Sequence, residues 1–248
     1  MLELRNITYE VEDNQDNKEI LKDVSLTIDE HFVAITGPNG GGKSTLAKVL
    51  MGIEKASAGQ IILDGEDISN YDINHRADAG IGYAFQQPPR FKGMTVMKLL
   101  SLSAGKELKR EECCKLLSTV GLCANEYIER EVDGTLSGGE MKRLEIATVL
   151  AKAHKVSIFD EPEAGIDLWS FSMLIKKFEQ IHKEKKESLI LISHQERIIR
   201  MADRIMVISD GKIDRIGPAE EILPTLLDTS SQEACCYGQQ KGGDYCEA

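Results

Sequence analysis

The chain has 248 residues, enough for one large domain with a full hydrophobic core, and its formal net charge is −11. This acidic balance argues against broad, non-specific binding to nucleic acid or to an anionic membrane. No segment approaches the ~20 apolar residues of a membrane span, and the first residues lack the charged-then-apolar pattern of a secretory signal. We therefore expect a cytoplasmic protein that binds no nucleic acid and makes no direct membrane insertion.

The first predicted elements are two strands. Residues 2–11 alternate apolar and polar side chains, and residues 20–28 are predicted to pair with them after a polar loop over residues 13–18. Together they indicate an antiparallel sheet beside the core. Tyr9 lies where its ring could stack on a base, and a core position is an equally good interpretation.

A glycine-rich loop follows, between a predicted buried strand at 32–35 and a predicted helix at 46–51. The loop consists of Gly37, Pro38, Asn39, Gly40, Gly41, Gly42, Lys43, Ser44 and Thr45. In this context the pattern is a phosphate loop, because its glycines let backbone N–H groups surround a phosphate. Lys43 can reach the β- and γ-phosphates, Ser44 can ligate Mg²⁺, and the helix N-terminus adds a partial positive charge.

The middle of the chain is predicted to change from strands to helices. Short strands are expected at 59–65 and 80–85, and the second ends in Gln86-Gln87-Pro88-Pro89, where the prolines stop regular structure. From Thr95 to about Tyr127 the pattern is helical. We expect a helical insert in an α/β core.

Two later apolar strands end in side chains that suit phosphate chemistry. The strand predicted at 156–161 ends in Asp160 and Glu161, and the strand predicted at 188–194 ends in His194. Carboxyl ends of parallel strands meet at one edge of a sheet, so these residues are expected beside the phosphate loop. There Asp160 can hold Mg²⁺, Glu161 can act as general base for water, and His194 can contact the γ-phosphate. The alternative for His194 is a capping histidine without a catalytic role.

The remaining predicted elements are a long helix at 168–186, a hairpin at 204–209 and 212–216, and a short helix at 219–227 interrupted at Pro224. Residues 229–248 are predicted to form a mobile tail. Its three cysteines could be exposed thiols or soft ligands for iron, and the sequence leaves both open; they are Cys235, Cys236 and Cys246.

A second glycine-rich turn, Leu136-Ser137-Gly138-Gly139-Glu140, resembles the signature of ABC-type ATPases. With the phosphate loop, Gln86, Asp160-Glu161, Asp167 and His194, the motif set of that superfamily is present in order. The resemblance implies an α/β P-loop NTPase fold, with a mixed central sheet, an antiparallel β subdomain and an inserted helical subdomain. The implied boundaries are an ATPase domain at 1–228, made of a core at 1–87 and 154–228 and a helical subdomain at 88–153, and a flexible cysteine-containing tail at 229–248.

The resemblance also implies a Mg²⁺-dependent ATPase that cleaves ATP to ADP and phosphate between two copies of the chain. Each ATP is then held by the phosphate loop and Tyr9 of one copy. The signature and D-loop of the second copy complete the site in trans, through Ser137, Gly138, Gly139, Glu140 and Asp167. The implied catalytic residues are Lys43, Glu161 and His194, and the implied magnesium ligands are Ser44, Gln86 and Asp160.

At several positions the chain differs from the typical transporter ATPase pattern and resembles SufC-type ATPases. These enzymes power iron–sulfur cluster assembly with SufB/SufD-like scaffold proteins. These positions are Glu140, Lys142-Arg143, Glu145, the segment 162–167 and the segment 87–93. The alternative is the ATPase subunit of a membrane importer or exporter, and Pro162 is typical of that class. Because a carboxylate at Glu140 would repel phosphates, we expect Lys142 and Arg143 to offset its charge or to pair with Glu161.

Overall fold

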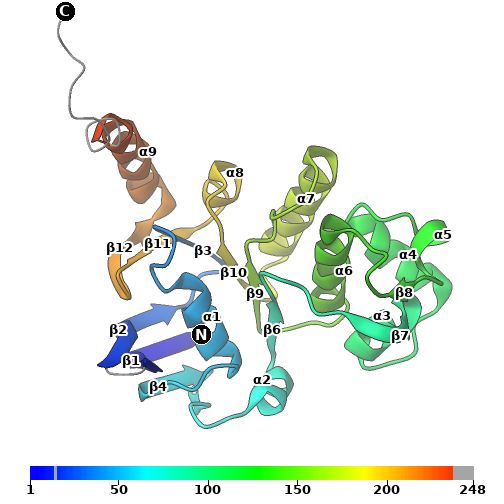
Figure 1. Ribbon diagram of the computed structural model, residues 1–248, viewed down its shortest axis with the longest axis horizontal. Coiled ribbons are helices and arrows are strands. Elements are labelled where there is room, and N and C mark those ends of the chain that lie inside the picture. Colours follow the sequence, from blue (N-terminus) through cyan, green and yellow to red (C-terminus); the bar gives the residue numbers. More distant parts are fainter. Residues whose placement is uncertain (14–15, 237–248) are drawn as a thin grey trace, which may run out of the picture.

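A six-stranded sheet forms the centre of the computed structural model, which describes residues 1–13 and 16–236 (Figure 1). In spatial order its strands are β12 (Lys212–Pro218), β11 (Arg204–Ser209), β3 (Phe32–Thr36), β10 (Ser188–Ile192), β9 (Val156–Asp160) and β6 (Ile81–Ala84). All are parallel except β12, which returns antiparallel to β11. The predicted mixed sheet is confirmed, and its parallel strands end at one edge.

Both faces of this sheet are buried, as its continuous apolar strands require. Along β3, Val33 and Ile35 join one hydrophobic cluster, whereas Phe32 and Ala34 join the other. The first cluster includes helix α1 (Lys43–Met51) and the antiparallel sheet, and the second includes helices α6 (Gly138–Leu150) and α7 (Leu168–Glu184). The sheet is therefore covered on both faces by packed side chains.

The antiparallel sheet beside the core is confirmed and has four strands. They are, in spatial order, β2 (Asp16–Ile28), β1 (Leu2–Asp13), β4 (Ala58–Leu63) and β5 (Glu66–Asp67). The polar loop between β1 and β2 is shorter than predicted, because the ladder continues to the pair Asp13↔Asp16. The alternation of apolar and polar side chains ends before these residues, so the sequence pattern did not predict that they pair. Backbone hydrogen bonding extends the hairpin there.

The middle of the chain forms the predicted helical region, at the right of Figure 1. After α2 (Ile73–Ala79) and β6 come β7 (Phe91–Thr95), α3 (Val96–Ala104), α4 (Arg110–Thr119), α5 (Ala124–Tyr127), β8 (Glu131–Val132) and α6. The β7–β8 ladder was not predicted. It pairs Phe91 with Val132 and Thr95 with Glu131, which is too short to give a periodic sequence pattern.

The last elements differ from the prediction at Pro224. After α8 (Glu196–Ile199) and the β11–β12 hairpin, helix α9 runs from Ala219 to Cys236 without a break. Proline removes one helical hydrogen bond, and packing of Leu223 and its neighbours Ile222 and Leu226 against the core offsets that loss.

The predicted tail therefore begins as helix. The side chains of Cys235 and Cys236, and all of residues 237–248 with Cys246, lie outside the part that the structure describes. The iron hypothesis for these cysteines stays a hypothesis. Among the described residues, no group of three or more His, Cys, Asp or Glu side chains is arranged to hold a metal ion. Within that same part, no helix combines the length and apolar character needed to cross a membrane.

Candidate functional site

The functional edge of the sheet gathers residues from four separate parts of the sequence. The phosphate loop follows β3, Gln86 follows β6, Glu161 follows β9 and His194 follows β10. Because these strands are parallel neighbours, their ends lie side by side, as the sequence predicts. Hydrogen bonds between the segments then define the site.

The phosphate loop needs glycine at particular positions. Gly37 has a φ of 128°, and a β-carbon there would lie 2.1 Å from the carbonyl oxygen of Ile208. Gly42 caps α1 with a φ of 106°. Helix α1 starts immediately after it, and the first N–H groups of a helix lack intrahelical acceptors. The loop thus presents the first N–H groups of α1 and the positive helix end to an anion.

Lys43 places its cation inside this loop. Its side chain is buried, and Nζ donates hydrogen bonds to the carbonyl oxygens of Gly37 at 2.7 Å and Pro38 at 2.8 Å. Burial lowers the pKa of Lys43, while the negative charges of Glu161 and Asp160 oppose this shift. The ammonium group is therefore held by the loop backbone beside two carboxylates.

Asp160 is fully buried and accepts hydrogen bonds from two neutral hydroxyl groups. Ser44 Oγ donates to Oδ1 at 3.1 Å, and Tyr83 OH donates to Oδ2 at 3.3 Å. Burial raises the pKa of Asp160, and the Ser44 hydrogen bond partly opposes the shift. A buried carboxylate next to a hydroxyl is the hard oxygen donor set that Mg²⁺ prefers, so the residues present fit the expected ion. Sequence reasoning missed Tyr83, which lies one residue before the end of β6.

Glu161 is paired with Gln86. Its backbone has a φ of 46°, its N–H donates to the carbonyl of Ile192 at 2.9 Å, and Oε2 accepts from Gln86 Nε2 at 2.9 Å. The expected pairing with Lys142 is wrong. Lys142 is buried, and its Nζ donates to the backbone carbonyls of Phe85 and, at 2.8 Å, Asp160.

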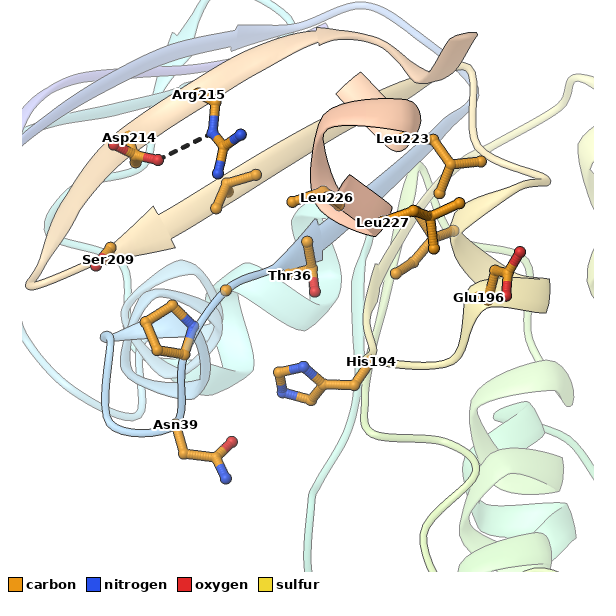
Figure 2. A pocket seen from close by; sticks show the side chains of 14 residues that line it. Thr36, Asn39, His194, Glu196, Ser209, Asp214, Arg215, Leu223, Leu226 and Leu227 are labelled. Atoms are coloured by element: carbon orange, nitrogen blue, oxygen red, sulfur yellow. Dashed lines mark hydrogen bonds and ion pairs between the residues drawn. The ribbon is translucent and has the colours of Figure 1, made fainter. Parts of the chain in front are cut away.

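His194 lines a cavity of about 720 Å³ together with Pro38 and Asn39 of the phosphate loop (Figure 2). Burial and the positive charge of Lys43 lower the pKa of His194. This shift favours the neutral imidazole, which can both donate and accept hydrogen bonds. The far wall of the cavity comes from β11, β12 and the leucines that begin α9, which the sequence did not predict.

The signature residues use Glu140 in an unexpected way. Ser137 caps α6, with Oγ accepting from the Glu140 N–H at 3.3 Å and its own N–H donating to Glu140 Oε2 at 2.7 Å. Tyr127 OH donates to the other Glu140 oxygen, and these hydrogen bonds lower the pKa of Glu140. The carboxylate is thus held by its own helix N-terminus and by Tyr127.

The expectation that Lys142 and Arg143 offset the charge of Glu140 is therefore wrong. Arg143 instead donates to Ser170 Oγ at 2.6 Å and to the Gly121 carbonyl at 3.0 Å. These contacts tie α6 to the start of α7 and to the segment that follows α4. The contact between Glu140 and Tyr127 could not be predicted from charge, because the nearby cations Lys142 and Arg143 bind other groups.

Asp167 lies close to the signature. It caps α7 by accepting hydrogen bonds from the N–H groups of Trp169 and Ser170, at 3.1 and 2.9 Å. A β-carbon on Gly139 would lie 2.3 Å from the Gly165 carbonyl oxygen, so the two segments touch through their backbones. Helix α1 lies on the other side of β6 and β9 from α6 (Figure 1). The predicted residues therefore fall into two groups, one at the phosphate loop and one at the signature.

Tyr9 lies at the margin of the core, and its stacking on a base stays a prediction. It is half-buried, packs against the hydrophobic core and donates its hydroxyl to Glu54 Oε2 at 2.6 Å. We expect Tyr9→Ala to weaken ATP binding roughly 5- to 150-fold, since stacking on a base is worth about 1–3 kcal/mol. Tyr9→Phe keeps the ring and should bind ATP normally. Titration calorimetry checks both, and unchanged affinity in Tyr9→Ala would make Tyr9 a core residue only.

Comparison with known proteins supports one family. A family model described as ABC transporter matches residues 21–164. An uncharacterized ABC transporter ATP-binding protein of Methanocaldococcus jannaschii is 41% identical over 215 residues, which cover 83% of this chain and 86% of that protein. The sulfate/thiosulfate import ATP-binding protein CysA of a Synechocystis strain is 35% identical; the match covers 82% of this chain but only 57% of that protein.

The fold comparison agrees. A solved dimeric bacterial ABC transporter cassette superimposes with a TM-score of 0.81 at 23% identity, covering 88% of this chain and 99% of the cassette. At this identity the similarity shows the fold.

Proposed function

We propose, given that the chain belongs to the ABC transporter family, that it hydrolyses ATP with Mg²⁺ at the strand-edge site and drives a partner protein. The main support for ATP hydrolysis is the position of the Lys43 ammonium. It is buried in a glycine-rich loop beside the carboxylates of Asp160 and Glu161. A cation, free N–H donors and a base in one place are what phosphoryl transfer to water requires.

Each residue of the phosphate-loop group has a proposed part. Lys43 and the first N–H groups of α1 bind the phosphates, and Glu161 accepts a proton from the attacking water. His194 hydrogen-bonds the γ-phosphate. Ser44 Oγ, the Asp160 carboxylate and the amide oxygen of Gln86 would hold Mg²⁺, which neutralises charge on the phosphates.

The signature group is proposed to act on the ATP of a second copy of the chain. Ser137 to Glu140 are absent from the wall of the cavity that holds Pro38, Asn39 and His194. They are nevertheless partly exposed at a helix N-terminus, which favours anions. Two copies facing each other would place each signature against the other copy's phosphates.

For the partner, we propose first a membrane transport complex, whose membrane-spanning part is another chain. This is supported by the names of the curated relatives, which are ATP-binding proteins of transporters. In this proposal ATP-driven closure of two copies moves the transport subunits.

The second candidate is a SufB/SufD-like scaffold of iron–sulfur cluster assembly. It is supported by the resemblance of Glu140, Lys142 and Glu145 to SufC-type ATPases. In the structure Glu140 binds Tyr127, and Lys142 and Glu145 bind Phe85.

Purification of the tagged chain from its native cells, with identification of what accompanies it, separates the two candidates. Co-purification of an integral membrane protein supports the transport complex. A soluble partner that carries iron and sulfide supports the scaffold and contradicts the first candidate. A chain that hydrolyses no ATP with either partner present would contradict the shared ATPase proposal.

A further inference from the structure

A buried lysine–glutamate pair on α6 holds the residue that precedes Gln86. Lys142 is 2% exposed and Glu145 is 8% exposed, and their charged atoms lie 3.8 Å apart. Glu145 Oε1 accepts from the Phe85 N–H at 2.7 Å, and Lys142 Nζ donates to the Phe85 carbonyl. Both backbone groups of Phe85 are therefore bound by side chains one helical turn apart.

The same lysine also holds the residue that precedes Glu161. Its Nζ donates to the backbone carbonyl of Asp160 at 2.8 Å. One ammonium group thus joins the ends of β6 and β9, each at the position directly before a functional side chain. Across this joint, Gln86 Nε2 and Glu161 Oε2 lie 2.9 Å apart.

Stability alone is a weak explanation for this pair. Glu145 Oε2 is buried and has no hydrogen-bond partner, although Lys142 lies nearby. Desolvation raises the pKa of Glu145 to about 7, against the opposing charge of Lys142. Buried ion pairs often contribute no more stability than apolar residues of the same size. What this pair restricts is the position of two strand ends.

We propose that Lys142 and Glu145 are positioning residues for ATP hydrolysis, which fix Gln86 against Glu161 and tie both to the helix that begins with the signature. This inference rests on the proposed ATPase function. Because Ser137 caps the same helix, any shift of α6 on contact with the partner's ATP would move Phe85 and Asp160 together. A shift of the signature helix would therefore change the position of Glu161, the predicted base.

Two substitutions of Glu145 separate positioning from general packing. Glu145→Ala removes the acceptor for the Phe85 N–H and should lower kcat about 10- to 100-fold, the usual cost of a small misplacement of reacting groups. The dissociation constant of ATP should stay near the wild-type value, because the Lys43 loop is untouched. Glu145→Gln keeps an oxygen acceptor and should recover most of the activity.

Glu187→Ala is the matched control. Glu187 is half-buried and accepts a hydrogen bond from Ser157 Oγ at 2.7 Å. Ser157 lies near the start of β9, whereas Asp160 ends that strand. Its loss should affect thermal stability without changing kcat. If Glu145→Ala does not fold, Lys142→Met is measured in its place, and the folded fraction of every variant is checked by circular dichroism.

A double-mutant cycle with Gln86→Ala decides the proposal. If Glu145 acts through Gln86, Glu145→Ala should slow the Gln86→Ala enzyme by less than about twofold, since the positioned group is already gone. An equal slowing in both backgrounds, or a folded Glu145→Ala with normal kcat, would overturn the inference. A wild-type chain without ATPase activity would instead overturn the proposed function, so the two failures are distinguishable.

Discussion

Glu161→Gln is expected to lower the rate of ATP hydrolysis about 10²–10⁴-fold, the usual loss when a general base is removed, while ATP stays bound. The glutamine has the same shape and can still accept the hydrogen bond that Gln86 Nε2 donates. It cannot take a proton from water. We therefore expect two copies of the variant to close around ATP and remain closed, which steady-state kinetics and size-exclusion chromatography with ATP would detect.

Glu163→Gln is the control for this substitution. Glu163 lies two residues further along the same loop and accepts a hydrogen bond from Ser193 Oγ at 2.6 Å, which glutamine can also accept. This variant should keep most of the wild-type activity. Wild-type turnover in Glu161→Gln would exclude Glu161 as the base, and an equal loss in both variants would point to a general effect on the loop.

Lys43→Met is expected to lose ATP binding and therefore all hydrolysis. Methionine fits the buried position but removes the cation and leaves the carbonyls of Gly37 and Pro38 without their donor. In the proposed complex Nζ donates to the phosphates instead, and the loss of two such hydrogen bonds from a charged group, at about 1.5–3 kcal/mol each, corresponds to roughly 10²–10⁴-fold in affinity. Fluorescent ATP titration measures the change.

Lys48→Met serves as the control, because Lys48 lies on the same helix but only half-buried and outside the loop. It should bind ATP as the wild type does. Normal affinity in Lys43→Met would contradict the phosphate-binding role. The contrast with Glu161→Gln, which should bind ATP without cleaving it, separates binding from chemistry.

The parts of the site that could be predicted are those encoded by local pattern. Apolar runs followed by Gly37, Gln86, Glu161 and His194 identify strand ends, and parallel strands place such ends together whatever the remaining packing. The phosphate loop carries its geometry in its glycines. The α/β core with a helical insert followed from the order of these elements, whereas the full fold class was implied by the resemblance of the motifs to those of ABC-type ATPases.

The contacts between segments could not be predicted in the same way. Glu161 meets Gln86, which lies 75 residues away, and Lys142 meets Phe85, which lies 57 residues away. Charge complementarity in the sequence suggested other pairings, because it does not show which backbone carbonyls are buried near a lysine. Likewise Pro224 predicts a helix break, and only the packing of α9 on the core reverses that expectation.

Each ATP site is proposed to be shared by two copies of the chain, and mixing two inactive variants tests this sharing. Lys43→Met disables the phosphate loop but leaves its signature intact. Gly138→Asp places a carboxylate at the signature, where a new β-carbon meets no other atom within 4 Å, and leaves the phosphate loop intact. A mixed pair then contains one complete site. We predict that the mixture hydrolyses ATP well above the sum of the two variants measured separately, whereas activity equal to that sum at every mixing ratio would contradict a shared site.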